Sequence, residues 1–475
     1  MDITDILTVI LERLRCNMVN KNDTFTVDII DIGTNGEGIA KLEDGYTLFI
    51  KDAVVGDKAL VKIMKTTKSY AYARLMEIIE PSEYRVQPKC PVAKQCGGCQ
   101  IQEISYEKQL EFKENKVKNN IIRIGGIKEP PMLPIIGMDQ PWKYRNKAQF
   151  PVGESKDGRV ISGFYAGRTH SIIECDTCDI GIDENREIMD IIKNYMNAEG
   201  ISAYNEESGK GLVRHVLIRK GFTTGQIMVC LVVNGNKLKN TEVLVDALLK
   251  IEGMTSISYS INKENTNVIM GKTIVNLYGN GYITDYIGDV AFRISPLSFF
   301  QVNPVQTRVL YGKALEFAGL TGKENVWDVY CGVGTISLFL AKNALKVRGV
   351  EIVPEAIEDA RKNAEINDIK NAEFFVGKAE EVLPNHFETT GEGADVIVVD
   401  PPRKGCEVSV LETMVKMQPK RIVYVSCDSA TLARDLKYLT ENGFSLDKVQ
   451  AVDMFPHSVH VETVILMTRC GFEEK

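Results

Sequence analysis

Two apolar, β-branched runs near the C-terminus constrain the fold of this chain more than any other stretch. Residues 396–399 lead into Asp400, and residues 422–425 lead into Ser426 and Cys427. An apolar run that stops abruptly at polar residues is typical of a strand buried on both faces of a parallel sheet. The ligand crevice of such a sheet lies at the carboxyl ends of its strands, so we expect Asp400 and Cys427 to meet at one edge. Cys427 is then either a nucleophile or a small packing residue, because free cysteine is often buried.

A strand, a glycine turn and a helix precede these runs. The expected strand covers residues 326–330, the turn follows at residues 331–334, and Glu351 stands near the tip of the next strand. An acid about twenty residues beyond Tyr330 is placed to bind ribose hydroxyls. The turn lacks the third glycine of the dinucleotide fingerprint and has no arginine or lysine for a pyrophosphate. The pattern therefore favours S-adenosylmethionine, which has a ribose and an adenine but no phosphate.

The end of the chain completes the predicted sheet. Residues 446–455 and 461–468 have the pattern of a terminal antiparallel hairpin. Added to the parallel strands before them, they predict the seven-stranded, Rossmann-like sheet of a methyltransferase.

The residue that follows Asp400-Pro-Pro bears on the methyl acceptor. Methyltransferases that act on exocyclic amines usually have an aromatic residue there, and this chain has Arg403. A ring carbon such as C5 of uracil becomes nucleophilic only after a thiolate adds to C6, and a base must later remove the C5 proton. Cys427 is the predicted nucleophile and Glu462, at the start of the last strand, the predicted base. Cys406 is a rival nucleophile, but it lies beyond Arg403, where the loop leaves the site.

A cysteine cluster precedes the catalytic half. Cys90, Cys96 and Cys99 lie within ten residues of one another, and two glycines between them allow the backbone to curl around one centre. This pattern predicts a metal site. Cys178 is the predicted fourth ligand and Cys175 its nearest rival. Four cysteines suit an iron–sulfur cluster or structural zinc, and the absence of a second knuckle at zinc-ribbon spacing favours the cluster.

The N-terminal region has a different period. Apolar residues at helical spacing predict an amphipathic helix over residues 3–16. Five short strands then follow, at residues 25–30, 38–41, 46–50, 59–65 and 71–79, which predicts a small β-barrel. The run from Lys58 to Arg74 is basic and contains two tyrosines, so it is either an RNA-binding surface or a lysine-protected edge strand.

The length, net charge and cysteine count of the chain limit its functional class. A chain of 475 residues is expected to form about two or three domains. A net charge of −7 argues against a uniformly basic nucleic-acid binder but allows local basic surfaces. The odd count of 11 cysteines suggests thiols or metal ligands in a reducing compartment. The sequence has no signal peptide and no apolar run long enough to span a bilayer, so we predict a cytoplasmic protein. We also predict a monomer, and nothing in the sequence requires an obligate protein partner.

Residues 32–40 and 54–57 make the barrel resemble the TRAM domain, an RNA-binding module. Taken with the cysteine spacing and the late sheet motifs, they make the chain resemble the RNA uracil-C5 methyltransferases that include the TRAM-bearing 23S ribosomal RNA enzymes and the transfer RNA enzyme. The segments that carry the likeness are Cys90–Cys99, Phe299–Asn303, Tyr330–Gly334, Asp400–Arg403, Ser426–Asp428 and His460–Glu462. The helix before the barrel is outside the shared pattern, and Thr335 replaces the asparagine of some members.

The resemblance implies a role for each predicted site residue. Cys90, Cys96, Cys99 and Cys178 would hold a [4Fe-4S] cluster. Contacts to S-adenosylmethionine would come from Gln301, Tyr330, Glu351 and Asp400. Cys427 would be the nucleophile and Glu462 the base. The substrate would be RNA, with 23S ribosomal RNA favoured over transfer RNA because the transfer RNA enzymes lack the barrel and the cluster.

The predicted organisation has four parts. They are an N-terminal helical extension (1–17), an OB-like TRAM β-barrel (18–80), a central α+β iron–sulfur domain (81–290) and an S-adenosylmethionine-dependent methyltransferase domain (291–475). The helix at about 105–125 is expected to pack on the last of these. Two other classes compete: a radical S-adenosylmethionine enzyme, whose cysteines usually follow a shorter spacing, and an RNA-binding protein with a decayed methyltransferase fold.

Overall fold

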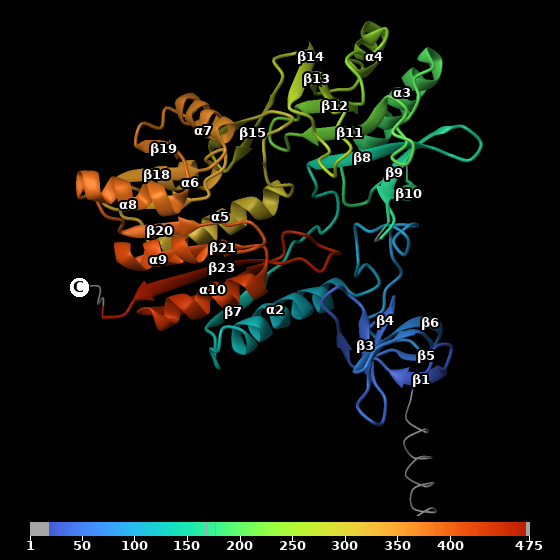
Figure 1. The fold of residues 1–475 in the computed structure, drawn as a ribbon, viewed down its shortest axis with the longest axis horizontal. Coiled ribbons are helices and arrows are strands. Elements are labelled where there is room, and N and C mark those ends of the chain that lie inside the picture. The colour runs from blue at the N-terminus through green and yellow to red at the C-terminus, as the bar shows by residue number, and fades with distance from the viewer. Residues whose placement is uncertain (1–18, 168, 176, 472–475) are drawn as a thin grey trace, which may run out of the picture. The chain divides into compact units, whose positions relative to one another are not determined.

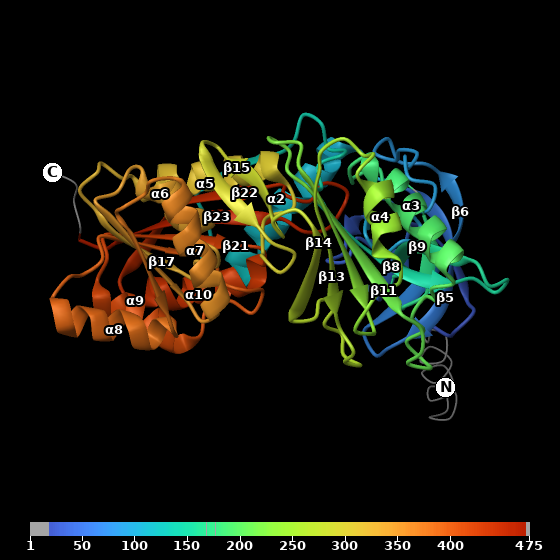
Figure 2. The same ribbon diagram turned by 90° about the horizontal axis from the view of Figure 1, so that it is seen from above.

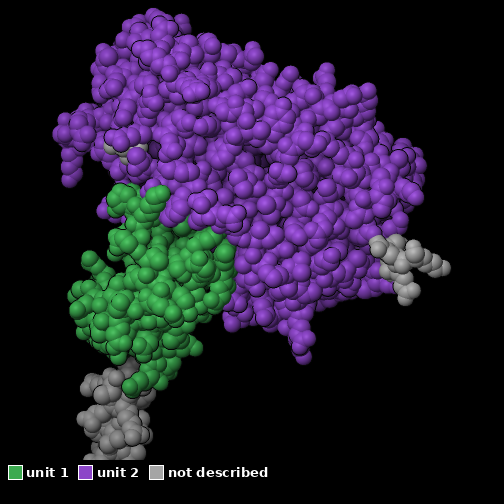
Figure 3. Space-filling model, turned by 180° about the vertical axis from the view of Figure 1, so that it is seen from behind, with its two compact units in different colours: residues 1–94, 98–112, 457–459 green, residues 95–97, 113–456, 460–475 purple. Residues whose placement is uncertain are grey.

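The computed structural model describes residues 19–167, 169–175 and 177–471. The helix predicted over residues 3–16 lies outside these ranges. The chain divides into two compact units, coloured separately in Figure 3. Unit 1 comprises residues up to 94, residues 98–112 and residues 457–459, and unit 2 comprises residues 95–97, 113–456 and those from 460 onward. Within the described ranges, no helix has both the length and the apolar character that a bilayer span requires.

Unit 1 is built on one antiparallel-rich sheet in the order β1-β5-β6-β4-β3-β2. Its strands are β1 (Thr24–Asp28), β2 (Asp31–Ile32), β3 (Gly38–Lys41), β4 (Thr47–Lys51), β5 (Lys58–Thr66) and β6 (Tyr70–Glu80). All five predicted strands form, and the two-residue β2, too short to show a period, is the addition. Alternate residues of β4 and β5, such as Leu48 and Ile63, are fully buried and form the core of this sheet.

The central sheet of unit 2 has the order β10-β9-β8-β11-β12-β13-β14. Its strands are β8 (Lys147–Glu154), β9 (Val160–Tyr165), β10 (Ile172–Glu174), β11 (Val213–Lys220), β12 (Ile227–Val233), β13 (Met254–Ile261) and β14 (Thr273–Tyr278). Apolar residues of α3 (Glu184–Glu199) and α4 (Thr241–Leu248) pack on one face of it (Figure 2). Every residue of β12 is buried, because both faces of this strand are covered.

The C-terminal sheet has the order β19-β18-β17-β20-β21-β23-β22-β7 (Figure 1). The seven predicted strands are β17 (Asn325–Val329), β18 (Lys346–Glu351), β19 (Ala372–Val376), β20 (Val396–Val399), β21 (Arg421–Ser426), β22 (Phe444–Val452) and β23 (Glu462–Arg469). The described part of the chain adds an eighth, β7 (Met132–Ile136), which pairs in parallel with β22. The prediction of seven strands therefore missed one, because β7 comes from far upstream in the sequence.

Helices cover both faces of this sheet. Residues of α5 (Pro304–Ala318), α6 (Thr335–Ala341) and α7 (Pro354–Ile366) share a core with Val396 and Val398. Residues of α8 (Ala379–Thr390), α9 (Val408–Met417) and α10 (Ser429–Glu441) share the opposite core with Ile397 and Val399. This alternation is the reason why the strands are apolar at every position.

A hairpin of β15 (Ile283–Ile287) and β16 (Val290–Ile294) joins the first of these cores. Phe292 and Ile294 pack there with residues of α5 and β17. The boundary predicted between residues 290 and 291 therefore falls inside this hairpin.

Helix α2 (Tyr106–Arg123) supplies a further piece of the C-terminal core. Val117 and Ile121 are fully buried among residues of α10 and β23. Lys113 and Asp453, both fully buried, form an ion pair with 2.6 Å between Nζ and Oδ1. This pair links a helix early in the sequence to the segment between β22 and β23.

Lys113→Met is expected to destabilise unit 2 by about 3–5 kcal/mol, because removing one partner of a buried ion pair leaves the other charge uncompensated. Urea denaturation followed by intrinsic fluorescence measures the change. Lys118→Met, on an exposed position of the same helix, is the matched control and should change the free energy of unfolding by less than about 0.5 kcal/mol. Equal stability of Lys113→Met and wild type would contradict the assigned importance of the pair.

Candidate active site

The carboxyl ends of four parallel strands meet the start of β23 at one edge of the C-terminal sheet. Val329 of β17 is level with Val350 of β18 and with Val399 of β20. Tyr330, Glu351 and Asp400 follow these three positions and therefore lie together at the sheet edge. Figure 1 shows the same strands side by side.

The antiparallel pairing of β21 with β23 places two further predicted residues at this edge. Ser426 is opposite Thr463, so Cys427 and Glu462 occupy the next level of the register. Cys427 is half-buried, and Glu462 is only 4% exposed. Two reactive side chains that are 35 positions apart in the sequence thus become cross-strand neighbours.

The environment of this pair disfavours negative charge. Burial, the nearby Glu462 and Asp400 raise the pKa of the Cys427 thiol to about 11, while Arg403 acts in the opposite direction. Burial and Asp400 raise the pKa of Glu462 to about 8, again against Arg403. In the unliganded protein both groups are therefore largely protonated at neutral pH.

The turn that carries Cys427 is held by its neighbours. Asp428 is the N-cap of α10, and its carboxylate accepts hydrogen bonds from the backbone N–H groups of Ala430 and Thr431 at 2.9 and 3.1 Å. The hydroxyl of Ser426 accepts from the backbone N–H of Asp428 at 3.1 Å and donates to its carbonyl at 3.0 Å. Cys427 is therefore fixed between a strand end and a capped helix start.

The glycine turn after β17 is tied to Glu351. One carboxylate oxygen of Glu351 accepts from the backbone N–H of Gly332 at 3.3 Å and the other from that of Val353 at 3.0 Å. Gly332 has a φ of 54°, and Tyr330 has a φ of 69°, which is uncommon for a residue with a side chain. Glu351 thus fixes the turn and remains half-buried at the strand tip.

Gln301 joins the site from the loop before α5. Its backbone carbonyl accepts a hydrogen bond from the buried Asn146 side chain at 3.0 Å. The Gln301 side chain contacts the hydroxyl of Tyr311, which also lies 3.2 Å from the hydroxyl of Thr335. Thr335 therefore takes part in a buried hydrogen-bond network.

Two further carboxyl groups lie at or just below this edge, the half-buried Asp400 and the fully buried Asp328 of β17. Burial raises the pKa of Asp400 to about 7. The pKa of Asp328, which accepts a hydrogen bond from Ser337, also rises to about 7, mainly through burial. The side chains of Glu351, Asp328 and Asp400 make this edge suited to a cationic ligand.

Several residues near the site were absent from the predicted set. His460 has its pKa lowered to about 4 by burial and by the charges of Arg403, Lys116 and Lys113. Tyr311 is fully buried on α5, where its position on an apolar face reads as an ordinary core residue. Nothing in the sequence around Lys116 of α2 predicts that it lies near the site, because only the fold brings α2 next to α10.

The rival nucleophile Cys406 is placed unfavourably. It is 4% exposed, and burial together with the nearby Asp435 raises its pKa to about 12. Its backbone N–H donates to Asp435 at 2.8 Å. The structure therefore makes Cys406 a less accessible thiol than Cys427.

The predicted metal site finds no support. Among the described residues, no group of three or more His, Cys, Asp or Glu side chains has an arrangement that could hold a metal ion. A cluster requires all its thiolates to converge on one centre. This result bears on Cys90, Cys96, Cys99 and Cys178 together, and hence on the predicted iron–sulfur character of the central domain.

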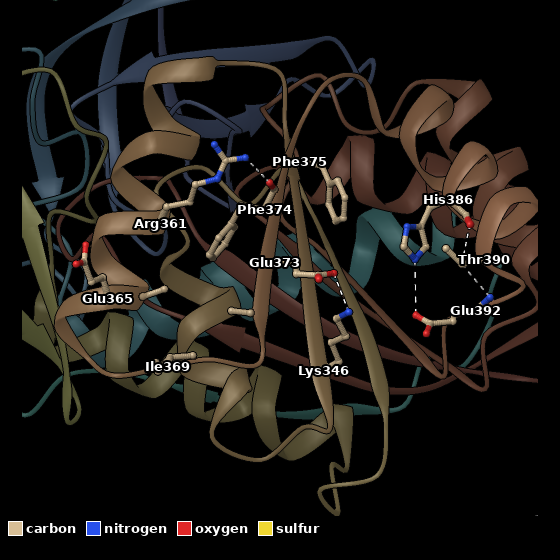
Figure 4. Close-up of a pocket in the computed structure, with 12 residues that line it drawn as sticks. Lys346, Arg361, Glu365, Ile369, Glu373, Phe374, Phe375, His386, Thr390 and Glu392 are labelled. Carbon is tan, nitrogen blue, oxygen red and sulfur yellow. Dashed lines mark hydrogen bonds and ion pairs between the residues drawn. The ribbon is translucent and has the colours of Figure 1, made fainter.

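A pocket of about 750 Å³ in the C-terminal domain lies elsewhere (Figure 4). It lies along the edge strand β19, with Arg361 of α7 on one side and His386 of α8 on the other. Arg361 donates to the carbonyl of Phe374 at 2.8 Å, and Lys346 pairs with Glu373 at 2.9 Å. None of the predicted site residues lines this pocket.

Comparisons with known proteins agree with the sheet and its edge. Residues 282–470 match the family described as tRNA (Uracil-5-)-methyltransferase, and residues 19–76 match the TRAM domain. An uncharacterized RNA methyltransferase of Clostridium acetobutylicum is 51% identical over 454 residues, covering 95% of this chain and 98% of that protein. One of Bacillus cereus is 50% identical over 452 residues with the same coverage. The chain belongs to the RNA (uracil-5-)-methyltransferase family.

The solved structure of another protein has the same architecture as this chain. The tRNA (uracil-54, C5)-methyltransferase of Pyrococcus abyssi, in complex with S-adenosyl-L-homocysteine, has a TM-score of 0.77 and 29% identity. The match covers 94% of this chain and 100% of that one. The family match and the open C-terminal sheet leave the radical S-adenosylmethionine alternative without support.

The contribution of the Asp400 and Glu462 carboxyls to the stability of this methyltransferase should fall as pH rises from about 5 to 8. The carboxyls of Asp400 and Glu462 hold protons in the folded state at pH values where the unfolded chain has released them. Glu462→Gln should therefore gain stability over wild type as pH rises through this range, by a few kcal/mol at about 1.4 kcal/mol per unit. Melting temperatures from pH 5.5 to about 8.5 test this.

The exposed Glu441→Gln substitution is the control and should leave the pH profile of the wild type unchanged. Parallel wild-type and Glu462→Gln profiles would show that Glu462 is not held protonated by burial.

Proposed function

We propose that this protein transfers a methyl group from S-adenosylmethionine to C5 of a uridine in RNA through a covalent adduct at Cys427. The observation that carries this proposal is the register of β21 against β23, which puts Cys427 beside Glu462. A thiol and a carboxyl at one sheet edge are the two groups that substitution at C5 of uracil requires.

The edge also suits the donor. S-adenosylmethionine carries a sulfonium cation, and burial raises the pKa of the half-buried Asp400, with no charge among the described residues that lowers it. We assign Glu351 to the ribose hydroxyls, because an acid at the tip of the second strand is placed for them. Gln301 and Tyr330 are assigned to the remaining donor contacts. When bound, the donor supplies the electrophilic methyl group.

The residues of the chain account for each bond change. The Cys427 thiolate adds to C6 of uracil, forming a C–S bond and making C5 enolate-like. C5 would form a C–C bond to the methyl group as the S–CH3 bond of the sulfonium breaks and its electron pair remains on sulfur. The former C5 hydrogen is then lost as a proton to the Glu462 carboxylate. The electron pair of that C–H bond reforms the C5–C6 double bond and expels the Cys427 thiolate.

Protonation must change before this sequence can begin. Cys427 and Glu462 have raised pKa values of about 11 and about 8 in the unliganded protein. A cation bound at the sheet edge lowers both, since a nearby positive charge favours the ionised form of each group. Adduct formation should therefore depend on bound donor.

We propose 23S ribosomal RNA as the substrate, on the cysteine pattern of the sequence and the family resemblance. The sheet of unit 1 offers an aromatic cluster of Phe49, Tyr70 and Tyr72, with ring centroids 5.5–5.9 Å apart. Tyr72 is 36% exposed, and such rings can stack on unpaired bases. Transfer RNA is the second candidate, because the matched solved structure is a transfer RNA enzyme.

Wild-type protein should form a covalent complex with 5-fluorouridine-substituted 23S ribosomal RNA when S-adenosylmethionine is present. Fluorine at C5 cannot leave as a proton, so the adduct is trapped after methyl transfer. A denaturing gel should show the shifted band for wild type and Cys406→Ala, whereas Cys427→Ala should lose it completely.

A Glu462→Gln variant extends this assay. It should accumulate adduct with ordinary uridine, because nothing removes the C5 proton. A band that survives Cys427→Ala would reassign the nucleophile, and a band with transfer RNA alone would select the second substrate.

We also propose, from the sequence pattern and the family resemblance alone, that Cys90, Cys96, Cys99 and Cys178 bind a [4Fe-4S] cluster. Protein purified without oxygen should then contain iron and acid-labile sulfide, and Cys90→Ala should lose both. Cys175→Ala, at the rival position, should retain them. Zinc without sulfide would select the alternative structural site.

A further inference from the structure

A second polar pocket lies in the central domain, away from the residues assigned to methyl transfer. Its volume is about 220 Å³. That is below the roughly 300–1,000 Å³ of pockets that enclose drug-sized ligands, so it suits a group of about one nucleobase. Its lining comes from Tyr165 at the end of β9, His170, Glu206, two residues of β11, and the loop 265–269.

One wall of this pocket is a hydrogen-bonded chain of side chains. Glu206 accepts from Nδ1 of His170 at 2.6 Å and from the hydroxyl of Tyr165 at 3.2 Å. Burial alone would raise the pKa of Glu206, but these hydrogen bonds outweigh it and lower the pKa. Glu206 is therefore an ionised carboxylate held in place by two hydrogen-bond partners.

The same hydrogen-bonded side chains determine which ring nitrogen of His215 carries the hydrogen. Burial lowers the pKa of His215 to about 4 and raises that of Tyr165 to about 12, so both are neutral at pH 7. The Tyr165 hydroxyl gives its hydrogen to Glu206, so Nε2 of His215, 3.3 Å away, must donate to the Tyr165 oxygen. Nδ1 of His215 is then a buried acceptor without a hydrogen-bond partner among the described residues.

The opposite wall is anchored by Arg214. This buried side chain donates through one nitrogen to the carbonyls of Asn262 and Glu264, at 3.1 and 2.7 Å. The Asn262 amide in turn donates to the carbonyls of Val268 and Ile269. The loop 265–269 is therefore held as a fixed wall.

The pocket offers a stacking surface together with acceptors. The rings of Tyr165 and His170 are stacked, with centroids 5.0 Å apart and an interplanar angle of 20°, and the side chain of His170 is 63% exposed. A base can extend this stack. The Glu206 carboxylate would repel a phosphate group and would accept N–H donors instead.

We propose that this pocket binds an unpaired guanine of the substrate RNA. Guanine presents two adjacent N–H donors, N1–H and the N2 amine, which match the two oxygens of a carboxylate such as Glu206. Uracil has one such donor, and adenine and cytosine have only an amine at that edge. The assignment rests on the proposed RNA substrate and adds a base-specific contact outside the methylation site.

Fluorescence anisotropy with full-length protein tests the proposal. The probes are a labelled oligouridylate with one central guanosine, the same RNA with inosine, which lacks the N2 amine, and oligouridylate alone. Wild type should bind the guanosine RNA about tenfold more tightly than oligouridylate, in line with the discrimination of a bidentate base contact, and inosine should fall between them. Glu206→Gln should abolish this preference without changing oligouridylate binding.

Two variants serve as controls. Glu207→Gln, at the adjacent exposed position that does not line the pocket, should keep the preference. His170→Ala should weaken guanosine binding by loss of stacking, with the melting temperature confirming the fold. Equal affinity for all three RNAs, or a preference that survives Glu206→Gln, would overturn the proposal. Equally effective competition by free guanosine monophosphate would overturn the assignment to RNA.

The covalent-adduct assay separates this proposal from the proposed function. Adduct formation without any guanine preference would refute the pocket assignment alone. Failure to form an adduct with both 23S ribosomal RNA and transfer RNA would refute the RNA substrate on which the guanine assignment rests.

Discussion

The antiparallel pairing of β21 with β23 is the interaction on which the assigned chemistry depends. It brings Cys427 and Glu462 to the same level of the register, one position beyond the pair of Ser426 and Thr463. A shift of one residue along either strand would turn the side chains of that strand to the other face. The register is secured because Ile422 and Tyr424 pack in one core while Val423 and Val425 pack in the other. Apolar packing throughout both strands therefore fixes the position of two polar groups at their ends.

Burial disfavours the ionised form of three carboxyl groups at the active edge. The carboxyls of Asp328, Asp400 and Glu462 are raised in pKa mainly by burial. Such groups reduce stability at neutral pH, and active sites commonly contain them. In the proposed function, a cationic donor would remove part of this cost and so couple donor binding to ionisation of Cys427 and Glu462.

The catalytic sheet is completed by segments that precede it by hundreds of residues. Strand β7 pairs with β22, and α2 packs against α10 while Lys113 forms a buried ion pair with Asp453. These contacts make the catalytic unit discontinuous in the sequence. Residues such as Lys116, which lies close enough to lower the pKa of His460, reach the site only through this arrangement.

Local sequence patterns determined the strands and their polar tips. The five strands of unit 1 and the terminal hairpin followed from periodicity, because burial on one or both faces imposes a repeat that is visible locally. The same reasoning placed Asp400, Glu351 and Cys427 at strand ends. Pairing between distant segments leaves no local repeat, so β7 and the buried Tyr311 could not be predicted in this way. Glu206 is the clearest case: its sequence neighbours are polar and exposed, and only the tertiary structure places it against Tyr165 and His170.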